Sequence, residues 1–220
     1  MIIAIEGGVG AGKTTLLKNL SKAPSVVTMP EYFDIIPSEE HDYILSLSKR
    51  EQLDIFLDIE KQRLSALNDS YCQETLYILD RSFLSLLSFQ HAIGQLHTLP
   101  SFIFTANHMF NNFILPDAVL HLDVDYELRK ERVGQRDHDV SSVLLEVDFV
   151  RRTRDFLDAV GSSVSYKRID TTQISPEEVL LQALAFINKC EPATNLQLSQ
   201  FSASVTRFTQ SASAGWRPEI

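Results

Sequence analysis

The first fifteen residues constrain the fold more than any other stretch of the chain. Residues 2–5 are all apolar, which is typical of a strand buried on both faces of a sheet. Residues 7–14 follow with the spacing G-x-x-x-x-G-K-[ST], and a helix is expected to begin near Lys13. A strand, a glycine-rich loop and a helix in this order form a phosphate-binding loop. The alternative is a glycine-rich turn with an unrelated lysine, which requires neither the strand nor the helix.

Each residue type in the loop has a physical role. Glycines allow backbone angles that point successive N–H groups inward, where they form a nest for phosphate oxygens. The N-terminus of the helix adds partial positive charge, Lys13 can reach the β- and γ-phosphates of ATP, and the Thr14 hydroxyl can hold Mg²⁺. The residues predicted to bind ATP are Gly7, Gly8, Val9, Gly10, Ala11, Gly12, Lys13, Thr14 and Thr15.

The composition excludes several classes of protein. A chain of 220 residues, 44% of them hydrophobic, predicts one sizeable core. A formal net charge of −9 argues against a broad surface for a nucleic-acid polymer or an anionic membrane. Cys72 and Cys190 are too few for a disulfide framework, no apolar run has the length of a membrane span, and the N-terminus lacks the pattern of a signal peptide. We therefore expect a cytoplasmic protein with reduced thiols.

Four further apolar segments alternate with helical patterns along the chain. The predicted strands are residues 25–29, 76–79, 118–124 and 163–169. The predicted helices are one of about five turns that begins with a capping box at Ser48, three over residues 83–95, 101–114 and 143–160, and two capped by Asp125 and Ser175. This alternation predicts an α/β fold with a parallel sheet, helices on both of its faces, and ligands at the carboxyl ends of the strands.

The composition changes near Pro192. Residues 1–192 contain all the predicted strands and form the predicted P-loop domain. Residues 193–220 are rich in Ser, Thr, Gln and Ala, with Phe201 and Trp216 as scattered aromatic residues. We expect this segment to be a tail outside the core, either disordered or packed as an extended arm. The polar residues 137–142 are expected to be mobile.

Residues at the ends of two predicted strands are candidates for chemistry on a phosphate. Asp80 follows an apolar strand and can reach Mg²⁺ directly or through water, while Arg81 can neutralise phosphate charge. The alternative is a helix cap at Asp80 beside a solvated arginine. Glu31, at the tip of the second strand, is the candidate general base for an attacking hydroxyl. Its alternative role is an acidic loop residue that neutralises a nearby arginine.

Arginines on the later helices suggest a lid. Arg132 and Arg136 lie four residues apart and share one helix face, which suits a lid that closes over a triphosphate and excludes water. A solvated basic face is the alternative, and the same alternative applies to Arg129, Arg151, Arg152 and Arg154. The six histidines show no metal-ligand spacing.

Several of these motifs resemble the thymidylate kinase and deoxynucleoside kinase superfamily. The resemblance covers residues 1 to about 190 and rests on the phosphate loop, Pro30-Glu31, Asp80-Arg81-Ser82, residues 122–125 with the two lid arginines, and residues 169–170 and 175–179. It implies a five-stranded parallel sheet of order 2-3-1-4-5, ATP and Mg²⁺ as cosubstrates, a small-molecule acceptor and an arginine-bearing lid. The catalytic residues would be Lys13, Glu31, Arg81, Arg132 and Arg136, with Thr14 and Asp80 at the metal.

The acceptor is less clearly indicated. The residues predicted to bind it are Glu31, Tyr32, Phe56, Arg63 and Arg81. Tyr32 stands where some thymidylate kinases place an arginine against a monophosphate, which favours a neutral acceptor. The phenylalanine-glutamine pair that reads the base in deoxynucleoside kinases is here Phe56-Leu57, so Gln62 or Arg63 would have to substitute on a rotated helix.

The sequence leaves several functions open. A deoxynucleoside kinase is expected first and a nucleoside monophosphate kinase second, followed by a kinase of another metabolite. A nucleotide-binding regulator without transfer activity belongs to a different class. A homodimer is one of the assemblies that the sequence allows.

Overall fold

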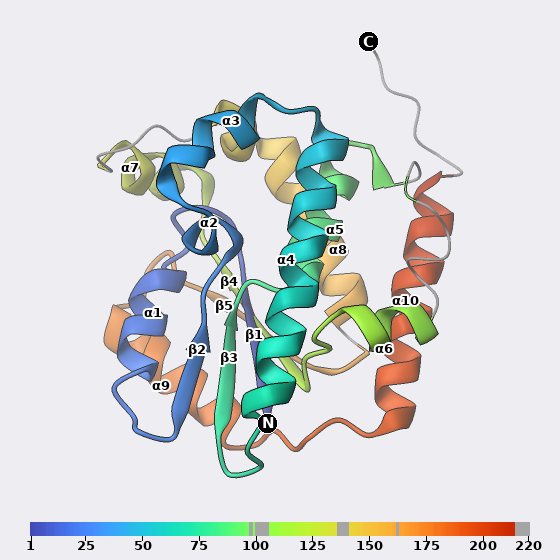
Figure 1. The fold of residues 1–220 in the computed structure, drawn as a ribbon. Helices are drawn as coiled ribbons and strands as arrows, with labels where there is room; N and C mark the ends of the chain where they lie inside the picture. The colour runs from blue at the N-terminus through green and yellow to red at the C-terminus, as the bar shows by residue number, and fades with distance from the viewer. Residues whose placement is uncertain (97–98, 100–105, 136–140, 162, 214–220) are drawn as a thin grey trace.

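The computed structural model describes residues 1–96, 99, 106–135, 141–161 and 163–213 of the chain. Its centre is a five-stranded parallel sheet of order β2-β3-β1-β4-β5 (Figure 1). The strands are β1 Ile2–Glu6, β2 Val26–Met29, β3 Leu76–Asp80, β4 Ala118–Asp123 and β5 Ser165–Asp170. The predicted α/β fold and strand order are therefore confirmed.

Helices cover both faces of the sheet. They are α1 Lys13–Leu20, α2 Tyr32–Ile35, α3 His41–Ser46, α4 Lys49–Ser70, α5 Phe83–Ala92, α6 Ala106–Asn112, α7 Tyr126–Gly134, α8 Val147–Gly161, α9 Pro176–Ile187 and α10 Asn195–Ser213. In the described part of the chain, 3₁₀ turns lie at Ser38–Glu40 and Ser142–Leu145. Ile3 and Ile5 of β1 face α1 and α9, whereas Ala4 faces the side covered by α4, α5, α8 and α10. This alternation follows from the two-residue repeat of a strand.

The predicted helix caps are present. The Ser48 hydroxyl accepts a hydrogen bond from the Glu51 amide, and the Glu51 carboxylate accepts one from the Ser48 amide, so α4 begins with a complete capping box. The Asp125 side chain caps α7, and the Ser175 hydroxyl caps α9. These short-range patterns fixed where the helices begin because a cap needs only neighbours along the chain.

Some predicted elements differ from the structure. The apolar run at residues 25–29 is typical of a strand buried in the sheet, but Val27 is 45% exposed, because β2 pairs with β3 alone among the described strands and forms an edge of the sheet. The helix expected over residues 143–160 begins at Val147, after a 3₁₀ turn. Of the helix expected over residues 101–114, the first five residues lie outside the described part, as do residues 137–140 of the polar segment.

The segment after Pro192 is the largest correction. It was expected to lie outside the core, but residues 195–213 form α10, which packs against α8 and α6. The Phe201 and Val205 side chains are fully buried, and the Phe201 ring lies 6.1 Å from that of Phe83, edge to face. The spacing of Phe201, Val205 and Phe208 presents one apolar helix face to the core. Trp216 lies outside the described residues.

In the part of the chain that the structure describes, none of the helices has the length and apolar character needed to cross a membrane.

Candidate active site

The phosphate loop joins β1 to α1 at the carboxyl edge of the sheet. Gly7, Gly10 and Gly12 have φ values of 141°, 79° and 94°, in the region that glycine adopts without strain. A side chain on Gly7 would collide with the carbonyl oxygen of Leu122 at the end of β4. The loop therefore needs glycine both for its backbone angles and for its close approach to the neighbouring strand.

Lys13 is buried at the start of α1. Its Nζ donates a 3.2 Å hydrogen bond to the carbonyl oxygen of Gly8, inside the loop. Burial lowers the pKa of Lys13 to about 7, with a further contribution from Arg81, while Asp80 and Glu31 oppose the shift. The loop thus holds an amine whose charged form becomes more favourable when anionic phosphates arrive.

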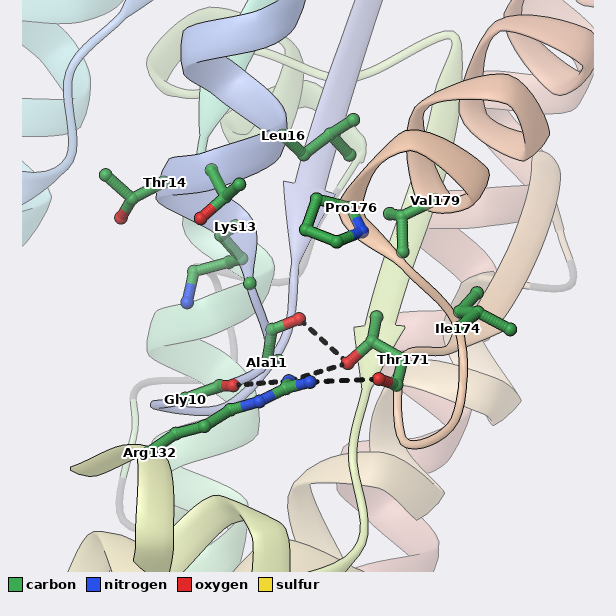
Figure 2. A pocket seen from close by; sticks show the side chains of 12 residues that line it. Gly10, Ala11, Lys13, Thr14, Leu16, Arg132, Thr171, Ile174, Pro176 and Val179 are labelled. Atoms are coloured by element: carbon green, nitrogen blue, oxygen red, sulfur yellow. Dashed lines mark hydrogen bonds between the residues drawn. The ribbon is translucent and has the colours of Figure 1, made fainter. Parts of the chain in front are cut away.

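A cavity of about 300 Å³ adjoins the outer side of the loop (Figure 2). It is lined by residues 10–16 and by Arg132 of α7. Thr171 and Ile174, between β5 and α9, and Pro176 and Val179, in the first turn of α9, line the other side. The cavity combines the exposed start of α1 with apolar side chains and one guanidinium group.

Arg132 connects the phosphate loop to the residue that follows β5. Its Nη1 donates 3.1 Å hydrogen bonds to the Gly10 carbonyl and the Thr171 hydroxyl, and its Nη2 donates a 3.0 Å bond to the Thr171 carbonyl (Figure 2). The arginine therefore lies beside the loop. Arg136 lies outside the described residues, so the predicted pair is not seen together. Thr171 was not identified from the sequence, because threonines after a strand form no distinctive pattern.

Glu31 and Arg81 meet on the other side of the loop. Glu31 is the N-cap residue of α2 and is separated from the end of β2 by Pro30, whereas Arg81 directly follows β3. Arg81 Nε donates a 2.6 Å hydrogen bond to Glu31 Oε2, and Arg81 Nη1 donates a 3.2 Å bond to the Gly7 carbonyl. The sheet order brings these predicted catalytic residues together because β2 and β3 are neighbours.

Asp80 and Thr14 have the oxygen donors that Mg²⁺ prefers. Asp80 ends β3, and its Oδ1 is buried without a hydrogen-bond partner among the described residues. Burial raises the pKa of Asp80 to about 6, an effect that Lys13 opposes. Thr14 is exposed in the first turn of α1. The described residues contain no group of three or more His, Cys, Asp or Glu able to hold a metal. Mg²⁺ is commonly held by one or two protein oxygens together with nucleotide phosphates and water, and the oxygens of Asp80 and Thr14 fit that pattern.

The remaining predicted acceptor residues form a buried cluster. The Tyr32 hydroxyl donates a 3.0 Å hydrogen bond to Glu60 Oε1, and Arg63 Nη1 donates a 2.6 Å bond to the same oxygen. The Phe56 ring lies 5.3 Å from that of Tyr32 and 5.5 Å from that of Phe33. Tyr32 and Arg63 are only 5% and 3% exposed, so their polar groups are held inside the protein.

Two buried carboxylates of this region, Glu60 and Glu6, were not predicted from the sequence to belong to the site. Glu60 is fully buried on α4, and Glu6 is fully buried at the end of β1. Glu6 accepts hydrogen bonds from the Ser82 amide and hydroxyl and from the Ser85 hydroxyl. Glu60 could have been noticed, because it interrupts the apolar stripe of α4 at helical spacing from Phe56 and Leu64.

The other arginines have different surroundings. Arg129 is buried against the loop, and both it and Arg154 contact the Asp123 carboxylate, at 3.5 and 2.8 Å. Arg151 is exposed and pairs with aspartates on its own helix, as expected for a solvated face. Asp123 thus lies at the end of β4, where two arginines contact its carboxylate.

Comparisons with known proteins agree with this fold. The sequence model of a family described as "AAA domain" matches residues 2–169. No curated protein matches the chain. Two solved structures of similar fold are a deoxyadenosine kinase from M. mycoides with bound dATP (20% identity, TM-score 0.66, covering 86% of this chain and 100% of that chain) and a thymidylate kinase from Candida albicans (18% identity, TM-score 0.61, 85% and 90%). The chain therefore belongs to the AAA domain family of P-loop proteins, and its fold is that of these kinases.

Proposed function

We propose that the protein is an ATP- and Mg²⁺-dependent phosphotransferase whose acceptor is the hydroxyl group of a nucleoside. The observation that carries this proposal is the Glu31–Arg81 pair beside the phosphate loop. A carboxylate there can accept a proton, and a guanidinium beside it can stabilise charge on the transferring group. Similarity of fold to a deoxyadenosine kinase and to a thymidylate kinase supports phosphoryl transfer, the activity that both of those enzymes share.

The donor nucleotide would occupy the loop and the adjoining cavity. The phosphates would bind the backbone N–H groups at the start of α1, with Lys13 paired to the β- and γ-phosphates. The nucleobase would enter the cavity of about 300 Å³, between the apolar Ile174 and Val179 and the planar guanidinium of Arg132. Thr14 and Asp80 would hold the Mg²⁺ ion, which neutralises phosphate charge when it is bound.

The acceptor would lie on the opposite side of the loop. Its hydroxyl oxygen attacks the γ-phosphorus, the bond from that phosphorus to the β–γ bridging oxygen breaks, and ADP leaves. Glu31 takes the proton of the hydroxyl, and Arg81 Nη1, now bonded to the Gly7 carbonyl, lies at the boundary between the two sites. Every step assigned to the protein is proton transfer or charge stabilisation, as phosphoryl transfer requires.

A nucleoside is favoured over a monophosphate because the nearby arginines are already paired with carboxylates. Arg81 is paired with Glu31, and Arg63 is buried in a bond with Glu60. A monophosphate would add two negative charges where Glu31 already provides one, and it would have to displace one of these pairs. A neutral hydroxyl acceptor needs no such rearrangement.

The test is a set of assays with matched nucleoside and monophosphate pairs as acceptors. We expect phosphorylation of a nucleoside in preference to its monophosphate, and a fall in kcat of about 10²–10⁴-fold in Glu31→Gln with little change in acceptor affinity. Glu39→Gln is the control, because Glu39 is exposed in the neighbouring 3₁₀ turn. A preference for the monophosphate with Glu31→Gln nearly as fast as wild type would favour a nucleoside monophosphate kinase. Nucleotide binding without transfer to any acceptor would favour a regulator.

A further inference from the structure

Arg81 has an unusual backbone conformation. Its φ is 62°, and it is the only residue other than glycine with a positive φ in the described ranges. A side chain makes this left-handed region unfavourable, so the conformation persists only when surrounding contacts hold it. The direction of the Arg81 side chain toward Glu31 depends on this backbone.

The peptide between Arg81 and Ser82 is held at both of its polar ends. Arg63 Nη2 donates a 2.9 Å hydrogen bond to the Arg81 carbonyl oxygen. The Ser82 amide, in the same peptide, donates a 2.9 Å bond to Oε1 of Glu6. Both charged side chains are buried, at 3% and 0% exposure, and charged partners make stronger hydrogen bonds than neutral ones. The peptide therefore cannot rotate without breaking two charge-assisted bonds.

Arg63 is itself fixed by its neighbours on α4 and α2. Glu60 Oε1 accepts bonds from Arg63 Nη1 and from the Tyr32 hydroxyl, and the Arg63 guanidinium lies 5.5 Å from the centre of the Tyr32 ring. A buried ion pair of this kind is a poor source of stability, because well-packed apolar side chains often stabilise a protein equally well. Its value is more readily explained by the geometry that it imposes on Arg81.

We propose that Arg63 is a positioning residue that holds the Arg81–Ser82 peptide and thereby orients the Arg81 guanidinium toward Glu31. Tyr32 and Glu60 support it. This inference rests on the proposed function of Glu31 and Arg81, and it replaces direct contact between Arg63 and the acceptor. The effect of Arg63 on transfer then passes entirely through Arg81.

The test removes the whole polar cluster at once. Arg63→Met alone would leave the Glu60 charge buried without its partner and would destabilise the fold. The triple variant Tyr32→Phe, Glu60→Leu, Arg63→Met leaves none of these polar groups behind and keeps the volume of the side chains similar. Arg50→Met is the matched control, because it makes the same arginine-to-methionine substitution on α4. The Arg50 side chain is half exposed and pairs with Asp54.

The first readout does not require activity. In ¹⁵N NMR spectra, the Arg81 Nε–H group should give a signal protected from solvent exchange by its 2.6 Å bond to Glu31, assigned by its disappearance in Arg81→Met. We expect the triple variant to keep its melting temperature within a few degrees and to lose this protection, while Arg50→Met retains it. A protected signal in a folded triple variant would overturn the proposal.

The second readout is a double-mutant comparison of transfer rates. We expect kcat to fall by about 10²-fold in the triple variant, as for a misplaced catalytic group, with little change in the acceptor KM. Adding Arg81→Met to the triple variant should give the same kcat as Arg81→Met alone. Additive losses, or a raised acceptor KM with unchanged kcat, would instead place Arg63 in contact with the acceptor. If the wild type phosphorylates no acceptor, the proposed function fails, and the NMR signal alone decides the role of Arg63.

Discussion

The Glu31 carboxylate accepts a 2.6 Å hydrogen bond from Nε of Arg81, a residue 50 positions later in the chain. The two residues meet because β2 and β3 are adjacent and parallel, so that both strands end at the same edge of the sheet. The Arg81 guanidinium also bonds to the Gly7 carbonyl. A single side chain therefore links the phosphate loop to the carboxylate proposed as the general base.

The positive φ of Arg81 predicts an unusual order of stabilities. Glycine adopts this backbone region without strain, whereas alanine does not, so Arg81→Gly should be more stable than Arg81→Ala by about 1 kcal/mol. Elsewhere in folded structure, glycine is normally the less stable of the two. Urea denaturation of both variants measures the difference, and Ser65→Gly against Ser65→Ala, at an exposed position inside α4, is the comparison at an ordinary helical position. Arg81→Ala as the more stable variant would show that the strain is not real.

Lys13→Met is expected to abolish phosphoryl transfer. The variant removes the lysine charge of the phosphate loop, and loss of such stabilisation at the transition state costs about 10²–10³-fold or more in kcat. Folding should survive, because an uncharged side chain at this buried position avoids the desolvation that lowers the pKa of Lys13. Lys18→Met is the control, since Lys18 is exposed in the last turn of the same helix. Near wild-type turnover in folded Lys13→Met would exclude this loop as the donor site.

Arg132→Ala is expected to weaken nucleotide binding and to slow transfer. The variant removes one wall of the cavity and three hydrogen bonds that connect α7 to Gly10 and Thr171. We expect kcat/KM for ATP to fall by about tenfold or more, with a smaller effect on acceptor affinity. Lys130→Ala, an exposed change on the same helix, should leave both unchanged. Full activity in Arg132→Ala would mean that the cavity does not hold the nucleotide.

The parts of the fold that the sequence predicted depend on neighbours along the chain. The phosphate loop, the alternating strands and the caps at Ser48, Asp125 and Ser175 are each visible within a few residues. Their presence at one sheet edge then follows from the parallel topology. The predicted topology therefore already places Glu31 and Arg81 at the same edge of the sheet.

The parts that the sequence did not predict depend on how elements pack. The burial of Glu60 and Arg63 depends on the rotation of α4 about its axis. The positive φ of Arg81 depends on hydrogen bonds with Arg63 of α4 and Glu6 of β1. The composition of residues 193–220 suggested a tail because polar residues dominate it. The apolar face of α10 nevertheless has helical spacing, and this periodicity carried more information than the composition.

Phe201→Ala tests the packing of α10. Phe201 is fully buried and contacts Phe83, the first residue of α5, so its truncation should lower the free energy of unfolding by about 3–5 kcal/mol. Leu196→Ala on the same helix should change stability by less than about 0.5 kcal/mol, because Leu196 is 68% exposed. Chemical denaturation followed by circular dichroism measures both. Equally small stability changes in the two variants would show that α10 does not belong to the core.

The docking of α10 should also weaken as the pH falls below about 6.5, the ordinary pKa of histidine. His91 of α5 packs with its ring 4.9 Å from Phe208 of α10, and burial together with the nearby charge of Arg152 lowers its pKa, which Asp155 partly opposes. A lowered histidine pKa means that the unfolded chain binds more protons than the folded one. The stability is therefore fully present above about pH 6.5 and declines as the pH falls through the folded pKa.

His91→Phe keeps an aromatic ring without a titratable group, so its stability relative to wild type should rise as the pH is lowered from 7.5 to 5. Parallel denaturation curves for the two proteins over this range measure the difference, and a constant difference would show that His91 is protonated equally in both states.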